Sequence, residues 1–199
     1  MSHVGDLLFV RRDRVDLDTL LRHHADVGVS QLVDQVPAAT FESPTDNQIA
    51  ETILKSASMR SLEVAFDQAT AAVEEVSIQV NNVFGDRVRV KGFRATKTIP
   101  FVGQPELWHL NTNPYDMNHP HGLVRGQTVV IGLEVREGEN QRAMTYINDT
   151  IANMRTYLER QATQIDAYNK SLPTRIAAAV QQRRKSLGGA NDLLKQLQR

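Results

Sequence analysis

The chain has 199 residues, of which 41% are hydrophobic and 23% are charged, the ordinary composition of a soluble globular protein with a real core. It contains no cysteine, which excludes disulfides, thiolate metal ligands and a thiol nucleophile. We find neither a signal-peptide pattern nor an apolar stretch long enough to span a bilayer. We therefore expect a cytoplasmic location and no membrane partner.

The net charge of zero hides an asymmetry between two parts of the chain. Residues 1–140 carry 13 Lys and Arg against 19 Asp and Glu, a balance of −6, and residues 141–199 carry 10 against 4, a balance of +6. Either the two parts attract each other, or the basic part faces an anionic partner. A solvated helical face is the ordinary alternative.

The first segment, residues 1–43, is expected to be a short helical lead-in. Leu17, Leu20 and Leu21 share one face of a helix over residues 16–25, for which Asp16 is a suitable N-cap. Gly28 is expected to interrupt this helix, with a short continuation after it, and Ser43–Pro44 marks a loop.

A second helix is predicted from Thr45 to about Ser58. Thr45 and Gln48 have the spacing of a capping box, in which each side chain satisfies a backbone amide of the first turn. Ile49, Ile53 and Leu54 line one face of this helix.

The pattern then changes to a period of two with β-branched residues, which indicates half-buried strands. The predicted strands are residues 62–66, 76–80, 88–91, 93–101, 121–125 and 128–135. Pro100 cannot donate to a β-ladder, so its strand should lie at an edge there or end there. Gly126–Gln127 fits a type II′ hairpin turn, and residues 128–135, the most apolar strand, should lie at the sheet centre. Residues 44–140 are expected to form this β-rich domain.

A long helix is predicted from Gln141 to Leu172, because its apolar residues recur every three or four positions, with one gap of seven between Leu158 and Ile165, and no Pro or Gly interrupts them. These residues are Met144, Ile147, Ile151, Met154, Leu158, Ile165, Tyr168 and Leu172. Ser171 and Pro173 then predict a helix restart, and Gly188–Gly189 a break. The fold class is therefore α+β, with short N-terminal helices, a small antiparallel β-sheet and a C-terminal long antiparallel helical hairpin over residues 141–199.

Three histidines are the candidate metal ligands. His109, His119 and His121 lie within thirteen residues, and two histidines separated by one residue on a strand share a face, a geometry that suits zinc or iron. A metal-dependent hydrolase is thus one functional alternative, although the spacing matches no complete catalytic motif. Otherwise no catalytic motif is recognised, and no cofactor is expected.

Two further groups of residues are candidate contact sites. Arg183, Arg184 and Lys185 form a basic cluster for contact with phosphates, so a nucleic-acid-binding accessory domain is a second alternative, against a solvated helix end. Trp108, with Leu107, Tyr115 and Met117, either lines a pocket or fastens its loop onto the sheet, and we favour the second.

Several segments resemble a bacterial family of mostly uncharacterised proteins. They are residues 49–54 (IAETIL), 60–64 (RSLEV), 76–80 (VSIQV), 98–108 (TIPFVGQPELW), 157–158 (YL), 168–173 (YNKSLP) and 182–187 (QRRKSL). The resemblance covers residues 45–187, most of the chain, and its two main motifs are fairly specific to this module. The family pattern does not require histidines at positions 109, 119 and 121, which weighs against the metal site.

The resemblance implies a role in a bacterial anti-phage defence or conflict system. In that family the module tends to precede an effector domain, often nuclease-like or of the TIR type. The leading functional hypothesis is therefore a non-catalytic interaction, sensor or oligomerisation module that couples recognition to an effector. We expect a homo-oligomer or an effector protein as partner, with Ile147, Ile151, Met154, Leu158 and Trp108 as contact residues. Residues 44–187 would then form one compact module.

Overall fold

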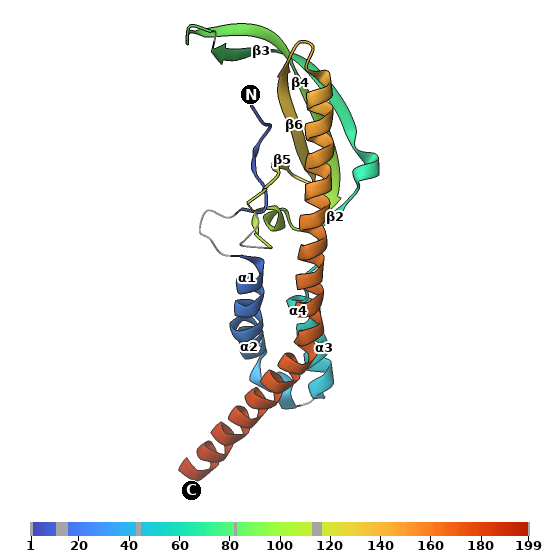
Figure 1. Cartoon of the computed structure of the whole chain (residues 1–199). Helices are drawn as coiled ribbons and strands as arrows, with labels where there is room; N and C mark the ends of the chain where they lie inside the picture. The colour runs from blue at the N-terminus through green and yellow to red at the C-terminus, as the bar shows by residue number, and fades with distance from the viewer. Residues whose placement is uncertain (1, 11–15, 43–44, 82, 113–116, 199) are drawn as a thin grey trace. The chain divides into compact units, whose positions relative to one another are not determined.

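The computed structural model describes residues 2–10, 16–42, 45–81, 83–112 and 117–198, and it confirms an α+β fold (Figure 1). The chain forms two compact units. The first comprises Met1–Asp16 and Ser61–Ala162, and the second Leu17–Arg60 and Thr163–Arg199. Both units are discontinuous in sequence, whereas the expected ranges were continuous. The predicted loop at Ser43–Pro44 lies outside the described residues.

The first unit contains a six-stranded antiparallel sheet in the order β1-β5-β6-β4-β2, with β3 paired to β4 outside this path. The strands are β1 (Asp6–Leu7), β2 (Glu63–Val64), β3 (Thr70–Asn81), β4 (Arg87–Val102), β5 (His121–Arg125) and β6 (Thr128–Arg136). Two short 3-10 helices, η3 (Phe66–Gln68) and η4 (Pro105–His109), connect them. As predicted, β6 lies inside the sheet, between β5 and β4.

The two strands predicted at residues 88–91 and 93–101 form one strand, β4, which passes through Gly92 and Pro100 without a break. The prediction that the strand ends or lies at an edge at Pro100 is wrong in this respect. Beyond Thr98 the neighbour of β4 changes from β3 to β2. Pro100 lies in this gap and accepts a hydrogen bond from the amide of Ala65, so no ladder bond requires its missing donor.

The β5–β6 hairpin turn agrees with its prediction. Gly126 has a φ of 55° while Gln127 is not among the residues with positive φ, which is the pattern of a type II′ turn. Arg125 pairs with Thr128 across it.

The core of the first unit lies between one face of the sheet and the beginning of the long helix α4 (Asn140–Leu197). Leu133 and Val135 of β6 pack with Ala143 of α4, and Ala95 and Tyr146 border this cluster. Farther along, aromatic rings fill the core: Phe9 stacks on Tyr157 of α4 at 4.7 Å between centroids, and both Phe9 and Phe101 contact Trp108.

The second unit is helical. It contains α1 (Leu17–His23), the π-helical turn η1 (His24–Gly28), α2 (Val29–Asp34), the 3-10 helix η2 (Ala38–Glu42), α3 (Asp46–Ala57) and residues 163–197 of α4. The expected interruption at Gly28 is wrong: Gly28 has helical dihedral angles. A Cβ at position 28 would lie only 2.8 Å from Cδ2 of the His24 side chain. Gly28 is therefore better explained by close packing than by a helix break.

The start of α3 follows the predicted capping box, with the Thr45 amide donating to Oε1 of Gln48 at 3.2 Å. The buried stripe of α3, Ile49, Ile53 and Ala57, belongs to the same unit as the buried residues Ile165 and Leu172 of α4. Between them, the Asn169 side chain bonds both the amide and the carbonyl of Met59, at 3.1 and 2.8 Å.

The predicted C-terminal hairpin is wrong, because α4 is a single helix of 58 residues with Pro173 inside it. An internal proline removes one helical hydrogen bond and costs about 3 kcal/mol. Here Leu172, Ile176 and Val180 are all fully buried, so packing holds the helical course on both sides of the proline. Gly188–Gly189 likewise lies within the helix. Among the described residues, no helix is apolar and long enough to cross a membrane.

Candidate functional site

A polar pocket of about 330 Å³ lies in the first unit and contains two of the three predicted histidines. We call it the histidine pocket. Its lining residues are His3, Asn118, His119, Pro120, His121, Tyr146, Asp149, Thr150 and Asn153. They come from the N-terminal segment, from the start of β5 with the residues before it, and from the first turns of α4.

The rings of the histidine pocket are stacked on one another. His3 lies between His121 and Tyr146, with ring centroids 4.3 and 5.1 Å apart. On the other side, Nδ1 of His119 lies 3.1 Å from the Tyr157 hydroxyl. These contacts hold the rings in place and leave a small polar hollow beside α4.

Burial shifts the pKa of two side chains in this pocket, His121 and Tyr146. Desolvation, followed by the nearby His3 ring, lowers the pKa of His121, while Asp6 acts in the opposite direction. Burial raises the pKa of Tyr146, so its hydroxyl stays protonated at neutral pH.

The structure separates His109 from the other two predicted ligands. His109 is exposed on η4 and does not line the histidine pocket. Among the described residues, no group of three His, Asp or Glu side chains is placed to hold a metal ion. Asp116, which lies between the predicted ligands in sequence, is outside the described residues. The described part of the chain therefore contains no set of metal ligands that would support the hydrolase alternative.

The predicted basic cluster belongs to the second unit, where two of its three cations have acidic partners. Nε of Arg184 lies 2.6 Å from Asp46, and Nε of Arg183 lies 3.6 Å from Asp34. Lys185 is exposed. Together with the ion pair between Arg175 and Asp26, these contacts support the first reading of the charge asymmetry, in which the basic helix attracts acidic helices.

The predicted contact residues on α4 lie largely in the core. Ile147 and Met154 are buried, whereas Ile151 and Leu158 are half-buried. Trp108 is fully buried against Phe9 and Phe101. Of the pocket expected around it, Leu107 is buried, Met117 is exposed and Tyr115 lies outside the described residues.

The β3–β4 hairpin continues beyond the end of β6, whose last pair joins Arg136 to Gly92 of β4 (Figure 1). We call the two-stranded part beyond this pair, residues 76–81 and 83–91, the outer hairpin. Its strands pair without a bulge, from Val76 opposite Gly92 to Asn81 opposite Arg87. Val83 and Phe84, at the turn, are 94% and 86% exposed.

The two faces of the outer hairpin differ in chemistry. The polar face, which is on the α4 side of the sheet, consists of Ser77, Gln79, Asn81, Arg87, Arg89 and Lys91, all exposed. The valine face consists of Val76, Ile78, Val80, Val88 and Val90. Within the described part of the chain, no ion pair involves Arg87, Arg89 or Lys91. The outer hairpin therefore presents three unneutralised cations on its exposed polar face, whereas its valine face is largely half-buried, with Ile78 buried and Val88 exposed.

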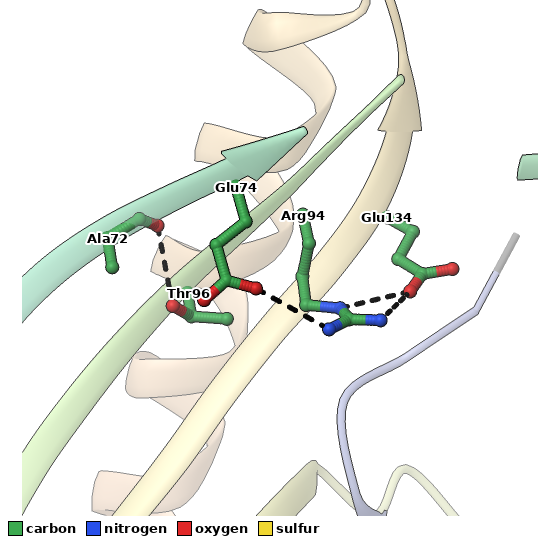
Figure 2. Close-up of polar contacts among 5 residues, drawn as sticks. All are labelled: Ala72, Glu74, Arg94, Thr96 and Glu134. Carbon is green, nitrogen blue, oxygen red and sulfur yellow. Dashed lines mark hydrogen bonds and ion pairs between the residues drawn. The ribbon is translucent and has the colours of Figure 1, made fainter. Parts of the chain in front are cut away.

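An arginine clamp joins the base of the outer hairpin to the sheet. Figure 2 shows Arg94 of β4 between Glu134 of β6 and Glu74 of β3. Its Nε and Nη2 donate to Glu134 at 3.0 and 2.6 Å, and its Nη1 lies 3.6 Å from Glu74. Thr96 also donates to the carbonyl of Ala72 on β3, at 3.3 Å. Both acidic side chains are thereby held on the side of the sheet opposite the polar face.

The sequence identified the strands of this region and two residues of the histidine pocket, His119 and His121, but not the outer hairpin as a site. The alternation at residues 76–80 and 88–91 was visible, and pairing the two segments would have placed the cations in one row. His3 carried no signal, because only the folded chain brings it to His121.

Comparison of the chain with known protein families, with curated proteins and with solved structures finds no match.

Proposed function

We propose that this chain is a non-catalytic interaction module and that the outer hairpin is its contact surface. The observation that carries the proposal is the exposure of the polar face of the outer hairpin, together with its exposed apolar tip. An isolated two-stranded hairpin is only marginally stable in water. Because the outer hairpin extends beyond the rest of the sheet, binding to a partner would stabilise it.

The apolar tip supports the same proposal. Val83 and Phe84 are almost fully exposed, although burying side chains of this size contributes about 1.5–3 kcal/mol each. Scattered exposed apolar residues are normal, but here two apolar residues that are neighbours in sequence are both exposed at the tip. A partner that covers this surface would recover that free energy.

The long helix gives the proposal its link to an effector. Because α4 runs through both units without a break, it is the element by which contact at the first unit would be coupled to the second. Oligomerisation through Ile151 and Leu158, which are half-buried, remains an alternative means of assembly. Analytical ultracentrifugation of Ile151→Asp and Leu158→Asp variants would test it.

Site-specific photo-crosslinking in the expressing cell tests the proposal. The variant Val83→benzoylphenylalanine places the reactive group at the tip, and Val102→benzoylphenylalanine, at a site that is 67% exposed at the other end of β4, is the matched control. We expect adducts from position 83 and few from position 102. Absence of adducts at position 83, or equal yields at both sites, would overturn the proposed function.

A further inference from the structure

The cations of the polar face form a row along one strand. Arg87, Arg89 and Lys91 alternate along β4, so their side chains leave the same face. At about 3.4 Å per residue, the row spans about 14 Å. A nucleic-acid duplex presents one negative charge per roughly 1.7 Å of its axis, so phosphates are available along the whole row.

The strand opposite the row provides uncharged hydrogen-bonding groups. Asn81, Gln79 and Ser77 pair with Arg87, Arg89 and Lys91 in turn. Amide side chains donate and accept hydrogen bonds, which suits sugar, phosphate and base edges. A two-stranded ribbon is also narrow enough to enter the major groove of a duplex.

The acidic groups near the outer hairpin do not cancel the row. Glu74 is held by Arg94 on the opposite side of the sheet (Figure 2). Glu75, in the middle of β3 and opposite Phe93, is on the same side of the sheet as the row, just beyond its inner end at Lys91, and Asp86 precedes Arg87 at the tip. Five exposed positions of the polar face, from Gln79 through Lys91, therefore carry cations and amides without a carboxylate among them.

We infer that the polar face of the outer hairpin binds a nucleic-acid duplex. Arg87, Arg89 and Lys91 contact phosphates, while Gln79 and Asn81 face the groove. This inference rests on the proposed function, because it assigns a nucleic-acid duplex to the polar face of the same outer hairpin. It differs from the cluster at residues 183–185, where Arg183 and Arg184 are already engaged within the second unit.

The row of amides favours a nucleic acid over an anionic membrane surface. An anionic membrane could bind the cations through its headgroups and the apolar tip through its acyl chains. It offers few specific hydrogen-bond partners for the side chains of Gln79, Asn81 and Ser77. A duplex can bind both the cations of β4 and the uncharged polar side chains of β3. Half or more of protein–DNA hydrogen bonds go to the backbone, and the remainder go to base edges.

Fluorescence anisotropy with a labelled DNA duplex, measured over a series of salt concentrations, tests the inference. Three phosphate contacts predict a slope of about −2.7 for log affinity against log salt, which is a loss of about 40-fold between 50 and 200 mM. We expect the triple variant R87Q/R89Q/K91Q to abolish this slope and reduce affinity by a similar factor at low salt. Circular dichroism verifies that the variant is folded.

The matched control is K55Q/R125Q/K170Q, which removes the same charge from exposed positions outside the outer hairpin. Binding should survive in this control. Equal loss in both triple variants would mean that only the overall charge matters, and this result would overturn the inference, as would absence of duplex binding in the unaltered chain. Binding to anionic phosphatidylserine vesicles in preference to the duplex would also overturn it.

Crosslinking from neighbouring positions separates the two proposals. Gln79→benzoylphenylalanine lies on the polar face and Val80→benzoylphenylalanine on the valine face, and the duplex should crosslink to position 79 only. If position 83 captures a protein in the cell and no variant captures the duplex, the proposed function stands and the inference fails. If position 83 captures nothing, the proposed function fails.

Discussion

Gly92 divides β4 into an outer half, residues 87–91, and an inner half, residues 93–102. The backbone is continuous through both halves, but the apolar side chains lie on opposite sides of the sheet in the two. In the inner half, four of the five side chains on the α4 side of the sheet are apolar, namely Phe93, Ala95, Ile99 and Phe101, with Lys97 as the exception, and Arg94, Thr96 and Thr98 face away. In the outer half, the α4 side carries the cations and the other side carries the valines. No bulge separates the halves, because the pairing of β3 with β4 keeps one register throughout.

This difference teaches that apolar alternation alone does not say which face is the core. The apolar side of the ribbon changes at Gly92, where the sheet loses β6. Ile78 of the outer hairpin lies across this glycine and is only 6% exposed. α4 covers the inner apolar side, whereas the valine face is turned toward the other side of the sheet.

The largest expected effect is on the inner half. Ile99 is fully buried, so Ile99→Ala should lower the free energy of unfolding by about 2–5 kcal/mol. Val88→Ala in the outer half, where the side chain is exposed, should change it by less than about 0.5 kcal/mol. Chemical denaturation measures both, and similar losses would contradict the contrast between the halves.

The next effect concerns the junction. A Cβ at Gly92 would lie 2.3 Å from Cδ1 of Ile78 and 2.5 Å from the carbonyl oxygen of Val135. Gly92→Ala should therefore cost about 1–3 kcal/mol by overpacking. Gly188→Ala is the control, since nothing lies within 4 Å of that position and alanine favours the helix. Thermal unfolding that ranks Gly188→Ala below Gly92→Ala would refute this explanation.

A smaller effect is expected from the arginine clamp. Arg94→Gln leaves Glu134, which is mostly buried, without its charged partner, and should lower stability by about 1 kcal/mol. Glu74→Gln should cost less than half of this, because that carboxylate is more exposed and lies farther away. Hydrogen exchange should show faster opening of β3 in the Arg94 variant.

The smallest effect is the pH dependence of the histidine pocket, which lies beside the inner sheet. Because folding lowers the pKa of His121, the unfolded chain binds the proton more readily between that pKa and the unfolded value of about 6.5. Stability should therefore fall as pH falls below about 6.5. His121→Gln should flatten this dependence, His3→Gln should reduce it and Asp6→Asn should increase it, as measured by denaturation across pH.

Local patterns predicted much of the fold. The Thr45–Gln48 cap and the Gly126 turn follow from a few residues, and the alternation located most strands. Pro173 misled the prediction, because buried packing on both sides of the proline outweighs its cost in α4. The candidate sites could not be predicted from local patterns. The row of cations depends on how β3 pairs with β4, and the contact between His3 and His121 forms only when distant segments of the chain come together.

The bulge-free register of the outer hairpin has a consequence for its length. One extra residue in each strand would move every cation to the valine side, whereas two in each strand would restore the faces and extend the row. The length of this arm can therefore change in steps of two residue pairs without altering the core beneath it. That makes the reach of the arm a quantity that can be adjusted separately from the fold that holds it.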